Sequence, residues 1–374
     1  MDLGLDEAQQ MLKNSARVFL EAECPDTYVR EMEQDERGYT PELWQKMAEQ
    51  GWLGLIVPEK YGGVGLTFLD LALLLEEMGK AMLPGPFFST VVMAGMTILD
   101  AGSEEQKQEL LPRIAEGQLI LTLALTEPSA RWDAVGVETI AKTQGDDYVI
   151  SGTKLFVPNA NVSDYLVVAA RTGQGEEDIS LFLVPRDTDG VSHTTLKTIA
   201  LDKQSEVALD NVTVPSSALL CEVNKGWETI RKVLQWGAVG KCAEMVGGSQ
   251  QVLDMTVEYA QQRVQFGRPI GSFQAIQHHC ANMATDVEGT RYITYQAAWT
   301  LSEGLPAERE VAVAKAWVSE AYRRVCALGH QCHGAIGFTK EHNMQLYSRR
   351  AKAAELAFGD ADLHLEAVAE AIGL

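Results

Sequence analysis

Residues 148–184 read YVISGTKLFVPNANVSDYLVVAARTGQGEEDISLFLV, and this stretch decides the fold class. Short apolar runs at 148–150, 154–157, 165–169 and 181–184 are separated by glycine, aspartate and asparagine. Runs of this length between turn residues are typical of β-strands. No segment between them is long enough for a crossover helix. The stretch therefore predicts an antiparallel β-domain rather than a parallel nucleotide-binding sheet.

Helical patterns lie on both sides of this β-region. Upstream, Thr40-Pro41-Glu42 and Ser103-Glu104-Glu105-Gln106 are typical helix starts, with a capping hydroxyl followed by an acid or amide. Downstream of about residue 226, apolar residues return at helical spacing. The predicted architecture is α+β and multidomain, with an N-terminal helical domain at 1–120, a middle β-domain at 121–222 and a C-terminal four-helix-bundle-like domain at 223–374.

The charge balance restricts the classes of partner. The chain has 31 Lys and Arg against 52 Asp and Glu, a formal net charge of −21. Such an acidic surface repels nucleic acid and anionic lipid, so neither is expected as a partner. The acidic N-terminus has no apolar signal core, and no apolar run approaches the ~18 residues of a membrane span. A cytoplasmic protein is the expectation.

Cysteine and histidine spacing gives no metal pattern. The six cysteines are scattered without a C-x-x-C pair, which predicts free thiols in a reducing compartment. Cys332 stands between His330 and His333, but this spacing fits no zinc motif. We therefore expect no metal site.

Five short motifs follow one another along the chain. They are Tyr61-Gly62-Gly63-Val64-Gly65, Leu125-Thr126-Glu127-Pro128, Gly152-Thr153-Lys154-Leu155-Phe156, Arg263-Val264-Gln265-Phe266-Gly267 with Phe273-Gln274, and Gln331 through Gly337. In this order, and on this α–β–α layout, the series resembles the acyl-CoA dehydrogenase family over essentially the whole chain. Arg263 also ends a mostly apolar helical stripe, where a charge is costly unless an anion or a nearby glutamate meets it.

The resemblance implies FAD bound between the β-domain and the C-terminal bundle, with part of each site supplied by a neighbouring subunit. By position, Leu125 and Thr126 would contact the flavin ring and Phe156 would pack beside it. Three residues would reach the cofactor of the partner subunit: Arg263, Phe266 and Gln274. Gln331 and Gly334 would meet its pyrophosphate and adenosine end. A guanidinium and a glycine-rich turn are suitable donors to phosphate.

The family's catalytic base is missing from its usual positions. The implied reaction is α,β-desaturation of an acyl-CoA thioester, in which a glutamate takes the α-proton and flavin N5 takes the hydride. Counted in register, the two positions that hold this glutamate in the family are Phe358 and Gly237, and neither side chain accepts a proton. Asp360 and Glu244 are tentative substitutes, although each is more simply an exposed or capping acid.

The expected flavin site departs from the family pattern as well. Trp132 replaces a hydroxyl that would bond the pyrophosphate, and Arg131 places a bulky cation where the backbone usually approaches the cofactor. Pro158 replaces a hydroxyl that would bond flavin N5. Each lost donor to a charged group costs ~1.5–3 kcal/mol, unless Arg131 supplies compensating charge. The backbone N–H of residue 358 would still help to hold the thioester carbonyl.

Three interpretations stay open at this stage. The chain is an active FAD-dependent acyl-CoA dehydrogenase with an unusual base, or a non-catalytic partner subunit of a heteromeric dehydrogenase, for example for steroid side-chain thioesters. In the third, it performs acyl-CoA chemistry or binding without abstraction of an α-proton. The family also implies an acceptor of the electron-transfer-flavoprotein type, a dimer or tetramer that is either homomeric or includes a second dehydrogenase-like chain, and a role in fatty acid or lipid catabolism.

Overall fold

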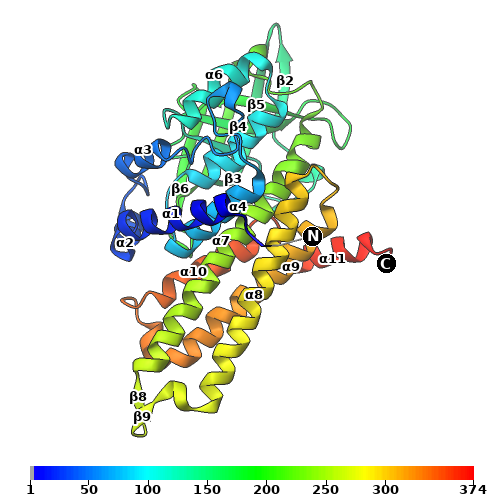
Figure 1. Ribbon diagram of the computed structural model, residues 1–374. Coiled ribbons are helices and arrows are strands. Elements are labelled where there is room, and N and C mark those ends of the chain that lie inside the picture. The colour runs from blue at the N-terminus through cyan, green and yellow to red at the C-terminus, as the bar shows by residue number, and fades with distance from the viewer. Residues whose placement is uncertain (1–3) are drawn as a thin grey trace. The chain divides into compact units, whose positions relative to one another are not determined.

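Helices form the N-terminal part of the chain in the computed structural model, which describes residues 4–374 (Figure 1). The helix starts predicted at Thr40 and Ser103 are confirmed. The Thr40 hydroxyl accepts a hydrogen bond from the Leu43 backbone N–H, and Ser103 forms a capping box with Gln106. The helices of this part are α1 (Glu7–Glu23), α2 (Asp26–Gln34), α3 (Pro41–Glu49), α4 (Phe68–Ala81), the π-helical η2 (Phe88–Gly95), α5 (Met96–Ala101) and α6 (Glu104–Ala115).

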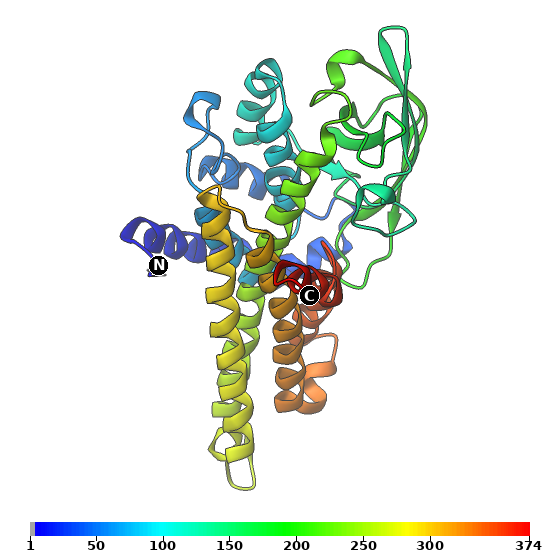
Figure 2. The same ribbon diagram turned by 90° about the vertical axis from the view of Figure 1, so that its right-hand side faces the viewer.

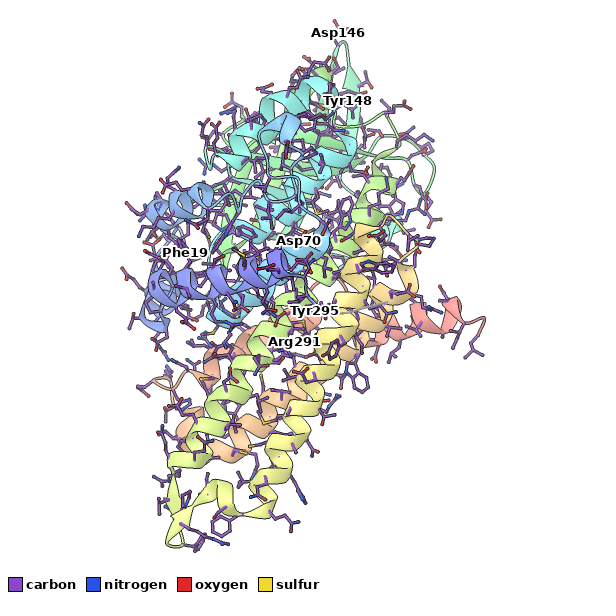
Figure 3. All side chains as sticks on the ribbon, in the orientation of Figure 1. Phe19, Asp70, Asp146, Tyr148, Arg291 and Tyr295 are labelled. Carbon is purple, nitrogen blue, oxygen red and sulfur yellow. The ribbon has the colours of Figure 1, made fainter. Side chains whose placement is uncertain are left out.

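The middle of the chain folds into one seven-stranded sheet, and the predicted β-domain is confirmed. Its strands are β1 (Leu121–Ala124), β2 (Ile140–Gln144), β3 (Asp147–Pro158), β4 (Tyr165–Arg171), β5 (Ile179–Pro185), β6 (Val191–Leu196) and β7 (Gln204–Pro215). They pair in the order β1-β4-β2-β3-β7-β6, and β5 pairs with β4. Asp146 stands at the tight turn from β2 to β3 (Figure 3).

Part of the sheet differs from the purely antiparallel pairing that the sequence predicts. β1 runs parallel to β4, with Leu121 opposite Tyr165, and β2 meets β4 in a parallel bridge at Ile140 and Arg171. The remaining pairs are antiparallel. The reason is the long connection 125–139. It brings the chain back to the end of the sheet at which β1 starts. β2 therefore runs in the same direction as β1, without any crossover helix.

Long helices form the C-terminal part, as predicted. They are α7 (Gly226–Gln262), α8 (Gln274–Ser302), α9 (Glu308–His333), α10 (Met344–Leu356) and α11 (Ala361–Ala371). A two-stranded hairpin, β8 (Val264–Gln265) and β9 (Arg268–Pro269), connects α7 to α8 at the far end of the long helices (Figures 1 and 2). Within residues 4–374, no helix combines the length and the apolar character that a membrane span requires.

The contacts group the chain into two units. The helical unit consists of the residues up to Arg30 together with Thr67–Leu83 and Ala238–Leu374, and the sheet unit consists of Glu31–Leu66 and Pro84–Gly237. The core of the sheet unit is a cluster of buried apolar side chains, including Ile150 of β3, Leu166 of β4 and Phe182 of β5. The consecutive domains at 1–120, 121–222 and 223–374 stay a prediction.

Two glycines let α4 and α7 touch through their backbones in the helical unit. A Cβ at Gly247 would lie 1.8 Å from the carbonyl oxygen of Glu76, and one at Gly79 would lie 2.1 Å from that of Glu244. Real Cβ atoms do not approach backbone oxygen this closely, so only glycine permits this crossing. The crossing brings the side chain of Glu76 into the interior between helices.

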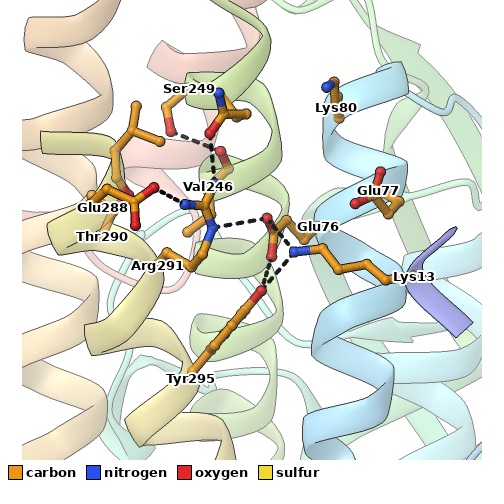
Figure 4. Close-up of polar contacts among 12 residues, drawn as sticks. Lys13, Glu76, Glu77, Lys80, Val246, Ser249, Glu288, Thr290, Arg291 and Tyr295 are labelled. Carbon is orange, nitrogen blue, oxygen red and sulfur yellow. Dashed lines mark hydrogen bonds and ion pairs between the residues drawn. The ribbon is translucent and has the colours of Figure 1, made fainter. Parts of the chain in front are cut away.

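The carboxylate of Glu76 joins three helices in the interior (Figure 4). It pairs with Lys13 of α1 at 2.8 Å and accepts hydrogen bonds from Tyr295 at 2.5 Å and Arg291 at 3.3 Å, both on α8. Lys13 also donates to the Tyr295 hydroxyl at 2.8 Å. Burial, followed by the charge of Glu76, raises the pKa of Tyr295 above its usual value, so this phenol stays protonated and donates.

We predict that Glu76→Gln lowers the free energy of unfolding by about 3–5 kcal/mol, because it leaves Lys13 and Arg291 in the interior without their shared counter-charge. Urea denaturation of the variant and the parent measures the change. Glu366→Gln, at an exposed position of α11, is the matched control and should change stability by less than about 0.5 kcal/mol. Equal effects of the two substitutions would contradict the prediction.

Candidate functional site

A buried ion pair connects two of the sequence motifs in the sheet unit. The Nζ atom of Lys154 lies 2.6 Å from Oε1 of Glu127, and their side chains are 0% and 3% exposed. Lys154 belongs to β3, and Glu127 follows the end of β1. Lys154 also donates to the Leu125 carbonyl at 3.3 Å, and the Leu155 N–H donates to the Thr126 carbonyl at 2.8 Å. These bonds fix the segment after β1 against the middle of β3.

The remaining hydrogen-bonding capacity of Glu127 is filled by backbone donors. Its carboxylate accepts from the N–H of Glu138 at 2.9 Å and from that of Thr139 at 3.0 Å. Burial lowers the pKa of Lys154 to about 8, because loss of hydration outweighs the attraction of Glu127. Sequence reasoning did not single out this pair. The only signal was that a Glu and a Lys stand inside motifs that are otherwise apolar or small.

A bulge in β3 turns one aromatic ring out of the sheet beside this ion pair. The pairing register of β3 with β7 shifts between Lys154 and Val157. Phe156 lies within the shift, with a φ of 52° and a side chain that is 52% exposed. A non-glycine residue with positive φ is strained, and such strain persists only where its surroundings fix it. Leu125 and Thr126 are half-buried next to it.

These three side chains form a platform on the sheet unit, defined here as Leu125, Thr126 and Phe156. The structure brings them together through the bond between Leu155 and Thr126 and the buried pair beneath. An aromatic ring, an aliphatic side chain and a hydroxyl with its backbone are suited to contact a flat ring system that is apolar on its faces and polar at its edge.

The loop after Glu127 contains two of the residues that depart from the family pattern. The guanidinium of Arg131 donates from Nε to Asp133 at 2.9 Å, and Asp133 also accepts from the Gly136 N–H at 3.1 Å. The side-chain hydrogen bond from Arg131 lowers the pKa of Asp133. The charge of Arg131 is therefore already met within its own loop. Trp132 and Pro158 are both partly exposed.

A second group of predicted residues lies at the hairpin end of the helical unit. Arg263, Phe266 and Gln274 are exposed, and Phe266 is 92% exposed with a φ of 53°. The centroids of the Phe266 and Phe273 rings lie 6.0 Å apart, and the two rings are nearly perpendicular. Within residues 4–374, no carboxylate pairs with Arg263. The ion pair with a nearby glutamate, which the sequence left open for this arginine, is therefore not observed.

Gln331 and Gly334 lie at the same end of the helical unit. α9 ends at His333, and Gly334 follows with a φ of 62° and no heavy atom within 4 Å of where a Cβ would be. His333 stacks on Tyr259 at 4.5 Å, which joins the end of α9 to the end of α7 just before Arg263. The structure thus gathers an exposed guanidinium, two exposed amides and an open glycine turn at one end.

The two positions that the resemblance assigns to the catalytic base lie in different kinds of backbone structure. Gly237 lies within α7, and Phe358 lies in the turn between α10 and α11 with a φ of 60°. Asp360 caps α11, because its Oδ1 accepts from the Leu363 N–H at 3.0 Å. Glu244 forms an ion pair with Lys241 at 2.5 Å. Both tentative substitutes thus have local structural roles.

Family models match nearly the whole chain. They describe the N-terminal, middle and C-terminal domains of acyl-CoA dehydrogenases and match residues 6–118, 122–212 and 224–373. The Bacillus subtilis protein named "Probable acyl-CoA dehydrogenase YngJ" is 35% identical over 372 residues, which cover 97% of each chain.

Solved structures agree with these matches. Butyryl-CoA dehydrogenase from Megasphaera elsdenii is similar with a TM-score of 0.93 and 30% identity, and the match covers 100% of both chains. A chain of the ChsE4-ChsE5 complex from Mycobacterium tuberculosis is similar with a TM-score of 0.91 and 31% identity, over 100% of this chain and 99% of that one.

We predict that Lys154→Met destabilises the chain by about 3–5 kcal/mol, since Glu127 would be left buried without its counter-charge. Chemical denaturation measures this loss. Lys142→Met, at an exposed position of the neighbouring strand β2, should stay within about 0.5 kcal/mol of the parent. If Lys154→Met were as mild as Lys142→Met, the ion pair would not hold the segment after β1.

The lowered pKa of Lys154 predicts that the stability difference between the parent and Lys154→Met depends on pH. The pKa of Lys154 is about 8 in the folded chain against a usual 10.5. Between these values the unfolded chain holds the proton and the folded chain has released it, so this group's contribution to stability rises with pH. The parent should therefore gain stability relative to Lys154→Met from pH 8 to pH 10, as measured by denaturation in a pH series. A constant or shrinking difference would contradict the lowered pKa.

Proposed function

This chain belongs to the acyl-CoA dehydrogenase family, and from that premise we propose that it is an FAD-dependent oxidoreductase that desaturates an acyl-CoA thioester between its α and β carbons. The observation that carries the proposal is the platform of Leu125, Thr126 and Phe156. A buried ion pair and a strained bulge hold these side chains at the surface, where they have little structural use of their own.

The residues present fit a flavin dinucleotide. The platform offers an aromatic and aliphatic surface with a hydroxyl at its edge for the ring system. In the helical unit, Arg263 offers paired donors for phosphate, and the open turn at Gly334 lets a backbone approach an anion closely. We assign ring contacts to the platform. We assign contacts with the cofactor of a partner subunit to the helical-unit group, which is Arg263, Phe266, Gln274, Gln331 and Gly334, with the last two at its pyrophosphate and adenosine end.

The protein's own part in the reaction is binding and positioning. Bound FAD supplies the two-electron acceptor for the oxidation. The platform would fix the plane of the ring, and the turn at Phe358 would present its backbone toward the thioester carbonyl. An N–H aimed at that oxygen stabilises the negative charge that develops when the α-proton leaves. Arg131 adds no free charge to the cofactor site, because Asp133 already pairs with it.

The absence of a proton acceptor at the two family positions favours a second candidate. Phe358 and Gly237 cannot accept a proton, Asp360 caps a helix, and Glu244 is paired with Lys241. We therefore propose as the alternative that the chain is one subunit of a heteromeric dehydrogenase, whose other chain supplies the glutamate. The structural similarity to a chain of the ChsE4-ChsE5 complex supports such an assembly. In the third interpretation, the chain binds acyl-CoA without taking an α-proton.

The remaining assignments rest on family membership. We propose an acceptor of the electron-transfer-flavoprotein type, a homotetramer or heterotetramer, and a place in the catabolism of fatty acids or other lipids in the cytoplasm. The helical-unit group, exposed in a single chain, is where a second subunit's cofactor would bind.

The absorbance spectrum of the purified chain tests the proposal. We expect flavin bands that bleach when a matching acyl-CoA is added without oxygen, because the thioester reduces the cofactor. A panel of straight, branched and ring-bearing acyl groups covers the unknown substrate. Stoichiometric flavin that no thioester bleaches would overturn desaturation by this chain alone and favour the third interpretation.

The heteromeric alternative gives the opposite result in the same assay. The chain alone would then be colourless, and flavin and activity would appear only on co-expression with a partner that carries a glutamate at one of the two base positions. Bright, stoichiometric FAD in a homo-oligomer that desaturates a thioester would exclude this alternative.

We predict that Trp132→Ser tightens FAD binding by roughly tenfold, the effect of about 1.4 kcal/mol, because it restores a hydroxyl donor for the pyrophosphate. Fluorescence titration of the deflavinated protein with FAD measures the affinity. Trp317→Ser, at a partly exposed site of α9, is the control and should leave the affinity unchanged. No gain from Trp132→Ser would mean that residue 132 does not face the cofactor.

A further inference from the structure

Lys315 is a fully buried lysine without a carboxylate partner. It lies in the middle of α9, and its side chain is 0% exposed. Lys154 is buried to the same extent but has Glu127 at 2.6 Å, whereas within residues 4–374 no carboxylate oxygen lies within ion-pairing distance of Lys315. An ammonium in the interior without a counter-charge is costly, so it needs hydrogen bonds to well-placed acceptors.

All three donors of the Lys315 ammonium are used, and all three acceptors are neutral. Nζ donates to the Ser319 hydroxyl at 3.0 Å, to the Glu355 carbonyl at 2.9 Å and to the Gly359 carbonyl at 2.9 Å. Glu355 lies in the last turn of α10, and Gly359 lies just before α11. One side chain therefore joins the two ends of the turn 355–360.

The turn that Lys315 spans has a strained backbone. Phe358 and Gly359 have φ angles of 60° and 90°, so two successive residues adopt left-handed conformations. For phenylalanine this is unfavourable and needs external support. A second side chain supports the same turn, because Nε2 of His364 lies 2.8 Å from the Phe358 carbonyl oxygen and donates to it. Three carbonyls of one short turn are thus bound by side chains.

We infer that Lys315 is a positioning residue that sets the backbone conformation of the turn 355–360, and that through this turn it sets how the protein holds the thioester. The second part rests on the proposed function, in which the backbone at Phe358 faces the thioester carbonyl. A single ammonium suits three converging oxygens, whereas the planar fork of arginine does not, and an apolar side chain would leave the carbonyls without donors.

The charge of Lys315 provides a second way to test the turn. Burial lowers the pKa of Lys315 to about 8 from its usual 10.5, so above pH 8 an opening of the turn that exposes this lysine takes up a proton. The neighbouring groups do not mask this change. Burial raises the pKa of Cys242 on α7 to about 12 and lowers that of His364, so the thiol and the neutral imidazole persist. The other charged groups whose fields reach Lys315 are Glu355, Asp360 and Lys241.

Hydrogen–deuterium exchange on the full-length chain tests the positioning role without any ligand. In Lys315→Met, amides of residues 355–364 should exchange roughly tenfold faster than in the parent, while those of β3 keep their rate. The matched control is Lys352→Met, a lysine on α10 whose Nζ reaches the Glu355 carboxylate at 3.2 Å and no backbone carbonyl of the turn. Equal protection of 355–364 in Lys315→Met and the parent would overturn the inference.

If Lys315→Met does not fold, the parent is measured at pH 7 and pH 9.5 with correction for intrinsic exchange. Because opening of the turn then takes up a proton, a selective gain of protection in 355–364 at the higher pH is expected, and unchanged protection overturns the inference.

Affinity separates the inference from the proposed function. Calorimetry compares two non-reacting probes, a 2-oxoalkyl-CoA that keeps a carbonyl and an S-alkyl-CoA thioether that lacks one. Lys315→Met should weaken the carbonyl probe about tenfold and the thioether less than twofold, whereas general damage to the fold would weaken both equally and overturn the specific role. If the parent binds neither probe, the proposed function fails, while hydrogen exchange still decides whether Lys315 positions the turn.

Discussion

A charge inside a protein must be met by opposite charge or by well-placed dipoles, and this constraint fixes the geometry at three places in the chain. Glu76 meets Lys13, Tyr295 and Arg291 and so joins α1, α4 and α8. Glu127 meets Lys154 and two backbone N–H groups and so joins the end of β1 to β3. Lys315 meets only neutral oxygens and so holds a turn. In each case the cost of burial is offset only when all partners keep their positions.

The same constraint explains why a buried ion pair lies beneath an exposed surface that carries no charge. The platform of Leu125, Thr126 and Phe156 contains no charge. Its rigidity comes from the ion pair beneath it, because Lys154 reaches both the Glu127 carboxylate and the Leu125 carbonyl. The strained φ of Phe156 is held by this attachment and by the shifted register of β3. The position of this exposed surface is therefore set by residues buried beneath it.

The turn at Phe358 is held firmly although it carries no proton acceptor. Phe358, the position that the resemblance assigns to the base, accepts no proton, yet Lys315 and His364 bind the carbonyls of this turn and its backbone is strained. A support of this kind serves the backbone rather than the missing carboxylate. It is consistent with a chain that still receives a thioester, whether the proton goes to an acid of its own or to one from another subunit.

The sequence by itself determined the order of helices, sheet and helices, the helix caps at Thr40 and Ser103, and the family, because periodicity, capping residues and motif order are local properties of the chain. It also located the absence of a glutamate at Phe358 and Gly237. Only the tertiary structure decided that β1 pairs in parallel with β4, that Lys154 pairs with Glu127, and that Lys315 bonds across the turn at Phe358. These contacts join residues that are 27 to 44 positions apart in the sequence. Local pattern does not encode which distant partner a buried charge will meet, because that choice depends on how the elements pack.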